Sequence, residues 1–463
     1  MHYEKLPDGS VKCIEDEIPF ELPERWEWTF LSNIVCVLNG DRGQNYPAKN
    51  KLQNEGIPFV SASNIEDGVV SADGLLCLSD AQYNALGAGK LVSGDIVYCI
   101  RGSLGKCGLF TMEKGAIASS LVIVRSILDN THVRDYIFLY LNSAFADEEI
   151  KKYDNGSAQP NLAAKDFTHF LVPIPPQKEM QRINEQAQKA LGYVKSIQNS
   201  KSELCDAIAM TKSKILDLAI RGKLVPQDSN DEPASVLLER IRAEKEELIK
   251  LGKIKRDKKE SVIFKGEDNS YYEKYHDGKL HCLDNELPFE LPEGWEWCRG
   301  INCFSKMQSK KPTGELFKYI DIDSIDNNKQ QLNKAKIISV NNAPSRASRV
   351  VFSGSVLFSL VRPYLKNIAL IDEGNADCIA STGFYICTSN GLLNSQFLYF
   401  LMISPYVVDG LNQFMKGDNS PSISKDDVEK WLYPIPPIEE QKAIASKIAA
   451  LFSYLDSIAE LLD

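Results

Sequence analysis

Residues 183–218 read INEQAQKALGYVKSIQNSKSELCDAIAMTKSKILDL, and this stretch decides how the chain is organised. Apolar side chains recur in it at alternating intervals of four and three residues, the spacing of a coiled-coil seam. A helix of this length would be on the order of 54 Å long. Periodicity alone leaves a second interpretation open, a helix buried in an ordinary globular core. The seam positions are Ile183, Ala187, Ala190, Val194, Ile197, Lys201, Leu204, Ile208, Thr211, Ile215 and Leu218.

The composition indicates a globular protein of two to three domains, because 43% of the 463 residues are hydrophobic. The first residues lack the apolar core of a signal peptide. No segment approaches the roughly 18 uninterrupted apolar residues of a membrane span. We therefore expect a cytoplasmic protein with no membrane partner. The eleven cysteines form no Cys-x-x-Cys pair, which favours reduced thiols.

Two segments occur twice, so the chain is a tandem repeat. Residues 18–28, Ile-Pro-Phe-Glu-Leu-Pro-Glu-Arg-Trp-Glu-Trp, return almost unchanged as residues 287–297, an offset of 269. We call them the first and second lead-ins. Pro-Ile-Pro-Pro at residues 173–176 returns at residues 434–437, an offset of 261. The residues between these matched ends diverge almost completely, so one frame holds two different inserts.

The second Pro-Ile-Pro-Pro is also followed by a heptad stripe, which gives the long helix a partner. Its positions are Ile444, Ile448, Leu451, Leu455, Ile458 and Leu462. Two such stripes in one chain favour an intramolecular antiparallel coiled coil over two separate core helices.

We therefore predict an α+β fold, a pseudo-two-fold tandem repeat with two globular domains joined by a long antiparallel coiled coil. We expect the first helix to begin after Pro175-Pro176 and to end near Arg221-Gly222. A helix is also expected over 133–142, and another from 233 to 251. The expected parts are a first domain with its lead-in (1–172), a first helical region (173–251), a basic and polar linker (252–271), a second domain with its lead-in (272–433) and a second, short helical region (434–463).

Motifs for cofactor chemistry are missing from this sequence. There is no G-x-x-x-x-G-K-[ST] phosphate loop, no G-x-G-x-x-G and no H-E-x-x-H. The Asn-Pro-Pro-aromatic motif of adenine methyltransferases is absent too, since Ile precedes both Pro-Pro pairs. We predict no catalytic residue, no metal site and no bound cofactor.

The doubled lead-ins, the doubled Pro-Ile-Pro-Pro and residues 216–227 (Leu-Asp-Leu-Ala-Ile-Arg-Gly-Lys-Leu-Val-Pro-Gln) resemble the specificity (S) subunit of type I restriction-modification systems. The resemblance covers nearly the whole chain. It implies a non-catalytic reader of double-stranded DNA whose two globular domains are target-recognition domains. It also implies two modification (methyltransferase) subunits as partners, with restriction subunits joining through them. S-adenosylmethionine, ATP and magnesium would belong to those partners.

Such a protein would read a bipartite DNA site, with an unread spacer whose length the coiled coil sets. Base reading needs hydrogen-bonding side chains on loops at the groove. Arg101 and Arg362 are the strongest candidates, because both repeats keep an Arg after the same expected strand. The predicted DNA contacts of the first domain are Arg42, Gln44, Asn45, Ser63, Asn64, Arg101, Ser103, Lys106, Gln159 and Asn161. Those of the second domain are Gln308, Lys310, Lys311, Asp323, Ser324, Arg362, Tyr364, Lys366, Asn419 and Ser422.

Two features of the sequence complicate this interpretation. The net charge of −10 is unusual for a DNA reader, unless partner subunits supply much of the phosphate neutralisation. The second helix reaches Asp463, opposite Ser202, and should pair along only about half of the first. A combined nuclease and methyltransferase, or a coiled-coil scaffold that does not bind DNA, are the alternative functions.

Overall fold

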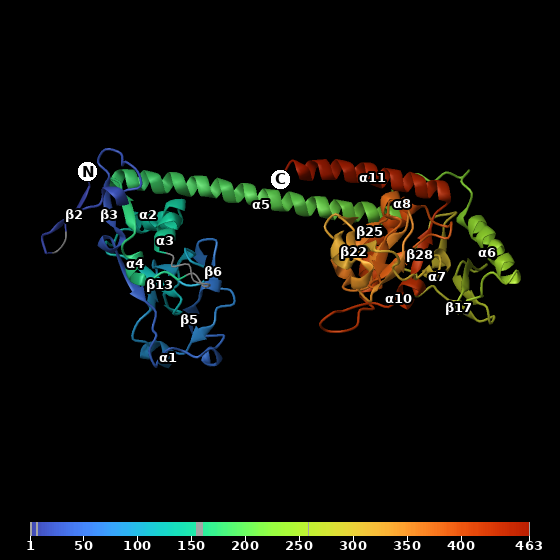
Figure 1. Cartoon of the computed structure of the whole chain (residues 1–463), viewed down its shortest axis with the longest axis horizontal. Coiled ribbons are helices and arrows are strands. Elements are labelled where there is room, and N and C mark those ends of the chain that lie inside the picture. The colour runs from blue at the N-terminus through green and yellow to red at the C-terminus, as the bar shows by residue number, and fades with distance from the viewer. Residues whose placement is uncertain (1, 6–7, 154–160, 258, 463) are drawn as a thin grey trace. The chain divides into compact units, whose positions relative to one another are not determined.

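A computed structural model describes residues 2–5, 8–153, 161–257 and 259–462. The chain divides into two compact units, Met1–Gln198 (unit 1) and Asn199–Asp463 (unit 2). The division falls within the long helix α5 (Gln177–Ile220). Figure 1 labels the elements of both units. Across the described ranges, no helix is both long and apolar enough to cross a membrane.

Unit 1 is built on a six-stranded sheet of order β4-β13-β10-β11-β7-β6 and a four-stranded sheet of order β8-β5-β12-β9. Helices α2 and α3 pack on the larger sheet, with Tyr136 and Ile150 in the same apolar core as Ile96 and Val122. The strands are β1 (Tyr3–Lys5), β2 (Val11–Cys13), β3 (Glu27–Phe30), β4 (Val35–Asn39), β5 (Ile57–Val60), β6 (Ile65–Glu66), β7 (Val69–Val70), β8 (Cys77–Leu78), β9 (Lys90–Val92), β10 (Ile96–Cys99), β11 (Cys107–Leu109), β12 (Lys114–Ile117), β13 (Leu121–Ser126) and β14 (Leu171–Ile174). The helices are α1 (Asp80–Ala85), α2 (Thr131–Leu141), α3 (Ala144–Tyr153) and α4 (Ala164–Phe167).

Unit 2 repeats this plan with a three-stranded sheet of order β25-β24-β27 and a four-stranded sheet of order β22-β19-β26-β23. A further sheet, β15-β16-β17, precedes the second lead-in. The strands are β15 (Ser261–Lys265), β16 (Tyr271–Tyr275), β17 (Leu280–Cys282), β18 (Glu296–Arg299), β19 (Leu316–Ile320), β20 (Ile325–Asp326), β21 (Gln331–Leu332), β22 (Lys336–Ser339), β23 (Ala347–Val350), β24 (Val356–Ser359), β25 (Ile368–Leu370), β26 (Ile379–Ser381), β27 (Phe384–Cys387) and β28 (Leu432–Ile435). The helices are α6 (Ala234–Lys250), α7 (Gly300–Cys303), α8 (Ser395–Ile403), α9 (Pro405–Asn412), α10 (Lys425–Lys430) and α11 (Ile438–Glu460).

The same two-stranded antiparallel pair closes each repeat. In unit 1, β3 pairs with β14 and places Trp28 opposite Pro173. In unit 2, β18 pairs with β28 and places Trp297 opposite Pro434. Proline is tolerated in these short pairs because a strand with only one neighbour has an N–H side that needs no ladder bond. The strand that ends each lead-in is thereby joined to the strand that precedes each long helix.

Local sequence signals explain the boundaries of the long helix, which were predicted correctly. Pro175 and Pro176 precede its first residue, Gln177, because proline is tolerated only in the first turn of a helix. At the other end Gly222 is left-handed, with φ +65°. The Lys223 N–H donates to the Leu218 carbonyl at 2.8 Å, which closes the last turn. The predicted helices near 133–142 and 233–251 are confirmed as α2 and α6.

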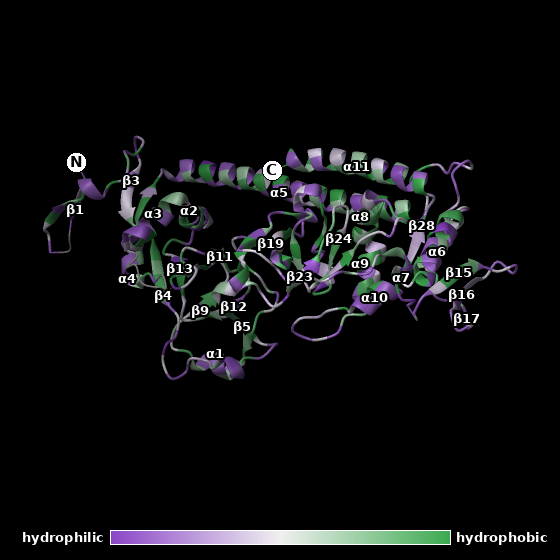
Figure 2. Ribbon diagram, turned by 45° about the vertical axis from the view of Figure 1, so that its right-hand side comes forward, coloured by the Kyte–Doolittle hydropathy of each residue, from purple (hydrophilic) through white to green (hydrophobic). Residues whose placement is uncertain are grey.

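Helices α5 and α11 contact each other in unit 2, as the two heptad stripes predict. Ile208 and Ile215 of α5 are buried there, and Lys212 forms an ion pair with Asp456 of α11. Figure 2 shows hydrophobic and hydrophilic residues alternating along both helices. Toward the N-terminus of α5 the seam emerges into solvent, with Ile197 69% exposed. Among the described residues, α11 therefore pairs with the C-terminal part of α5.

A buried carboxyl group lies at the start of α11. Glu440 accepts a hydrogen bond from Trp295 Nε1 at 2.8 Å, and its other oxygen has no partner among the described residues. Burial raises the pKa of Glu440 to about 6, although the bond from Trp295 opposes the shift. A carboxyl group whose pKa is higher in the folded state than in the unfolded state stabilises the fold only while it is protonated and neutral. Its contribution to stability is complete below the ordinary pKa and is lost as the pH rises toward 6.

We predict that Glu440→Gln removes the loss of folding stability that Glu440 causes as the pH rises. From the pKa of about 6 and the ordinary value of 4.5, the loss is about 2 kcal/mol at most. The variant should melt at a higher temperature than the parent chain at pH 8, and the difference should vanish near pH 4.5. Thermal unfolding of the full chain across this range measures it. Glu439→Gln, at an exposed neighbouring position, is the control. Equal pH slopes for parent and Glu440→Gln would contradict the assignment.

Candidate nucleic-acid interface

The sheet topology of unit 1 brings several predicted residues to one edge. Strands β4 and β10 both pair antiparallel with β13, so they run in the same direction and end at the same edge. Strand β5 runs parallel to β12, which residues 118–120 connect to β13. The segments that follow β4, β5 and β10 therefore surround residues 118–120. We call this set, residues 40–45, 61–64, 100–106 and 118–120, the unit 1 loop edge.

Hydrogen bonds tie these segments together. The Ile100 N–H donates to the Ser120 carbonyl at 3.0 Å, and Ala118 N–H to the Val60 carbonyl at 2.8 Å. Arg42 reaches the Ser119 carbonyl at 3.5 Å. The loop is also braced by Asp41, whose pKa is lowered because its carboxylate accepts bonds from backbone N–H groups, first of all that of Gly43.

Arg101 lies on this edge beside the segment that precedes α4. Its Nε donates to Asn161 Oδ1 at 3.1 Å, and the two residues also form an isolated backbone bridge. Two predicted residues that are 60 positions apart in the sequence are thus brought into contact. Ser103 and Lys106 are exposed on the same loop. Gln159 lies outside the described residues.

Unit 2 has an equivalent edge. Strand β26 runs parallel to β19, and residues 382–383 connect it to β27, which pairs with β24. The Leu360 N–H donates to the Gly383 carbonyl at 2.8 Å, the counterpart of the bond from Ile100. Lys310 is attached through its backbone, which donates to the Ser348 carbonyl at 2.8 Å. We call residues 308–311, 321–324, 346, 360–366 and 382–383 the unit 2 loop edge.

Arg362 occupies the place of Arg101 in this second edge. Its guanidinium donates to the Asn419 carbonyl at 2.8 Å, and neighbouring Val361 forms a backbone bridge with Ser422. Arg362 and Lys366 both have left-handed backbone conformations, with φ +47° and +54°. Such conformations are strained for residues with side chains and concentrate at functional sites. Tyr364, between them, is exposed.

Several of the predicted residues have interactions that hold the local structure, among them Asn45, which donates to the Ala85 carbonyl at 2.8 Å, and Ser63, which bonds to Ser61 at 2.8 Å. Asn64 accepts bonds from the backbone and hydroxyl of Ser61 and caps a short helical turn. Ser324 does the equivalent for Asp321 and is only 4% exposed, so its side chain offers almost no surface to a ligand. Asp323 forms an ion pair with Lys336. Gln44, Asn45, Ser63, Gln308 and Lys311 are exposed.

The cations named here at the two loop edges have no anionic partner among the described residues, unlike those of the unit 2 cavity such as Arg299 and Lys259. No described carboxylate forms an ion pair with Arg42, Arg101, Lys106, Lys310, Lys311, Arg362 or Lys366. A positive charge without an internal partner remains available to an external anion such as phosphate. The loop edges therefore combine free positive charge with exposed amide and hydroxyl groups.

The structure adds residues that the sequence did not single out. Arg346 is exposed at the unit 2 loop edge, where its carbonyl accepts a bond from Thr382 N–H at 2.8 Å. Ser119 and Ser120 occupy the centre of the unit 1 loop edge. They precede β13 in the chain, and only the sheet pairing shows that they lie beside the loop after β10. No sequence pattern marks any of the three.

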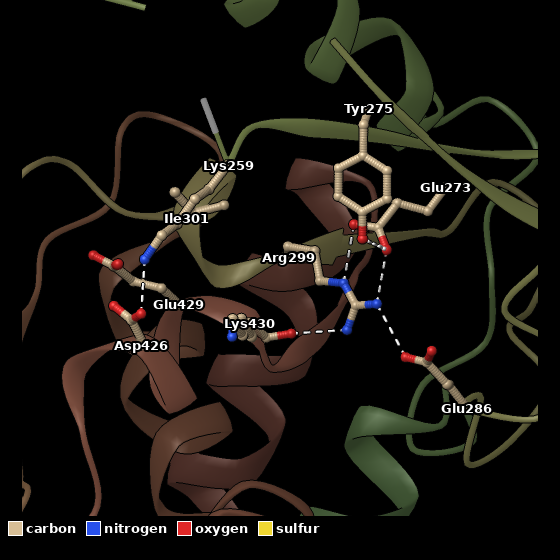
Figure 3. A pocket seen from close by; sticks show the side chains of 9 residues that line it. All are labelled: Lys259, Glu273, Tyr275, Glu286, Arg299, Ile301, Asp426, Glu429 and Lys430. Atoms are coloured by element: carbon tan, nitrogen blue, oxygen red, sulfur yellow. Dashed lines mark hydrogen bonds and ion pairs between the residues drawn. The ribbon is translucent and has the colours of Figure 1, made fainter. Parts of the chain in front are cut away.

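A cavity of about 600 Å³ in unit 2 has a different character (Figure 3). Arg299 lies at its centre and forms ion pairs with Glu273 and Glu286, while Lys259 pairs with Asp426. Burial alone would raise the pKa of Glu273, but bonds from Arg299 and Ser261 outweigh it and lower the pKa. These ion pairs neutralise charges of the cavity wall. The pair between Glu273 of β16 and Arg299 of β18 also holds sheet β15-β16-β17 against the second domain.

No site for a metal emerges from the described part of the chain, where no group of three or more His, Cys, Asp or Glu side chains converges. The nearest sequence spacing to a zinc site pairs His276 and His281 with Cys298 and Cys303. In the structure His281 bonds to Glu286 at 2.7 Å, and both cysteines are buried in the apolar core.

Known proteins of one family match this chain over both of its repeats. The family described as "Type I restriction modification DNA specificity domain" matches residues 23–204 and 301–463. The EcoAI specificity subunit of Escherichia coli is 27% identical, over 96% of this chain and 80% of that protein. The EcoEI specificity subunit of Escherichia coli is 24% identical, over 97% and 81%.

The fold has a solved counterpart as well. A chain in a structure titled "Structural basis underlying complex assembly and conformational transition of the type I R-M system" superposes with a TM-score of 0.61. It is 17% identical, and the alignment covers 96% of this chain and 94% of that one. The predicted mixed α and β architecture, with two related domains and paired long helices, is thus confirmed. With two matched domains over most of its length, the chain belongs to the family of type I restriction-modification DNA specificity subunits.

Proposed function

We propose that this non-catalytic specificity subunit reads a bipartite DNA target, with one half-site at each loop edge. The observation that carries the proposal is the equivalence of Arg101 and Arg362. Each follows the same strand of its repeat, is exposed, and contacts the segment before the last helix of its domain. The surrounding side chains differ between the repeats, so the half-sites should differ in sequence. We retain the remaining predicted residues of both edges as candidate contacts, except Ser324, whose side chain is buried.

The proposal also assigns partners and domain limits. Two modification (methyltransferase) subunits would bind the chain, and restriction subunits would join through them in the cytoplasm. S-adenosylmethionine, ATP and magnesium would be held by those subunits. The target-recognition domains would extend over 1–172 and 272–433, the helical regions over 173–251 and 434–463, and the linker over 252–271. Because the chain carries a net charge of −10, we expect the partners to supply much of the phosphate contact.

We predict that Arg101→Ala and Arg362→Ala each relax recognition of one half-site only. Loss of a base contact should reduce discrimination at that half-site by roughly 5- to 150-fold. The measurement is methylation by the full chain with its modification subunits, on duplexes that vary one half-site at a time. Lys279→Ala, which removes an exposed cation paired with Asp277 on another part of unit 2, is the control. Equal weakening at both half-sites for each variant would contradict separate readers.

We also predict that α5 sets the length of the unread spacer. Four residues inserted near Leu204 lengthen a helix by about 6 Å, which is close to two base pairs of duplex. Methylation mapping should then show a target with unchanged half-sites and a longer spacer. A spacer of the parent length in the methylated target would rule out this role for the helix.

A further inference from the structure

The turn that follows β24 holds two apolar side chains in solvent at the unit 2 loop edge. Tyr364 is 45% exposed and Leu365 is 38% exposed. They lie between Arg362 and Lys366, two of the cations that have no carboxylate partner among the described residues. Single exposed apolar residues are common on protein surfaces. This pair, however, stands on a constrained backbone.

Hydrogen bonds and a buried proline fix the shape of this turn. Pro363–Leu365 form a single turn of 3-10 helix, and the proline ring is buried. The Leu365 N–H donates to the Arg362 carbonyl at 2.9 Å. The Arg362 N–H donates to the Pro421 carbonyl at 2.8 Å, which ties the turn to the segment before α10. Tyr364 is therefore presented on a preformed backbone, so a ligand would not have to order the turn on binding.

The counterpart turn of unit 1 presents a different surface. Its left-handed positions are glycines, Gly102 and Gly105, both with φ +80°. In unit 2 the left-handed positions carry charged side chains, and only there is the conformation strained. Ser103 is exposed, while Leu104 is half-buried against the apolar core. No apolar side chain within 101–106 is exposed as the pair in unit 2 is.

The bases of duplex DNA offer few apolar groups to such a pair. In the major groove the base edges present hydrogen-bond donors and acceptors, and the C5 methyl group of thymine is the apolar exception. 5-Methylcytosine carries a methyl group at the same ring position. An aromatic ring and an aliphatic side chain match a methyl group because their contact removes apolar surface from water.

We propose that Tyr364, supported by Leu365, reads the C5 methyl group of a pyrimidine in the half-site of unit 2. This inference rests on the proposed function, because the loop edge must face the groove. The cations on either side of the pair would hold the turn against the DNA backbone. The counterpart turn of unit 1 has no such pair, so the preference for a methyl group at this turn belongs to unit 2.

The test is methylation by the full chain with its modification subunits on duplexes that carry uracil in place of thymine. This replacement removes only the methyl group. Methylation mapping first gives the target, and Arg101→Ala identifies the half-site of unit 1, so that the other half-site belongs to unit 2. Uracil at one position of the unit 2 half-site should lower kcat/KM roughly fourfold, the effect of one buried methyl group.

Two variants of one residue separate the ring from the hydroxyl group. Tyr364→Ala should make thymine and uracil equivalent in the unit 2 half-site and leave the response of the unit 1 half-site unchanged. Tyr364→Phe should keep the preference for thymine, since the ring remains. Both variants should melt at the parent temperature, because the side chain is largely exposed. The comparison of thymine with uracil for the parent chain requires no variant.

Duplexes with 5-methylcytosine in place of cytosine distinguish the two sources of the methyl group. If the mapped half-site of unit 2 holds no thymine, 5-methylcytosine must raise methylation there for the proposal to stand. Equal methylation of thymine and uracil duplexes by the parent chain, with no response to 5-methylcytosine, would overturn it.

The variants can also contradict the proposal. A Tyr364→Ala chain that keeps the preference for thymine would exclude the ring as the reader. Loss of the preference in Tyr364→Phe would assign the contact to the hydroxyl group. An equal loss for Tyr364→Ala on thymine and uracil duplexes would indicate stacking on bases instead. Failure of the proposed function is distinct from all of these, since the parent complex would then methylate duplexes regardless of the sequence of either half-site.

Discussion

Each repeat depends on one constraint, the antiparallel pairing of its lead-in strand with the strand before its long helix. In unit 1 this joins Trp28 to Pro173, 145 positions later, and in unit 2 Trp297 to Pro434. The pairing encloses an insert that differs between the two repeats, and the frame is closed by residues outside the insert. The helix that follows each pair starts at a defined place, since the Pro-Pro dipeptide admits a helix only after it. Two domains of different sequence are thereby attached to their helices through the same frame.

The surfaces of the molecule differ in whether their cations form ion pairs with carboxylates. Around the unit 2 cavity Arg299 and Lys259 are fully paired with carboxylates, so their charges contribute to packing. At the loop edges the guanidinium groups of Arg101 and Arg362 donate to an amide oxygen and a backbone carbonyl, and neither has a carboxylate partner among the described residues. A chain with net negative charge can therefore still present positive charge where a polyanion would lie. The distribution of ion pairs is more informative about DNA binding than the net charge.

The two lead-ins also show that nearly the same sequence is buried to different extents in different structural surroundings. Trp295 is buried and bonded to Glu440, whereas Trp26 is half-buried and its Nε1 has no partner among the described residues. The local backbone and the aromatic contacts are alike in both copies. In unit 2 the end of α5 covers the lead-in, and among the described residues no helix end covers the first copy. Burial and the raised pKa of Glu440 are thus properties of the assembled unit 2.

The sequence by itself determined the repeat, the helix boundaries and the pairing of α5 with α11, because heptad spacing, Pro-Pro and a terminal glycine act locally. It also placed Arg101 and Arg362 after equivalent strands. Only the tertiary structure decided which loops meet, since strand order is set by pairing between distant segments. In the folded chain Asn161 contacts Arg101, and Arg346 and Ser119 lie at the loop edges. Ser324 is buried. Burial and neighbours depend on contacts that no single stretch of sequence contains.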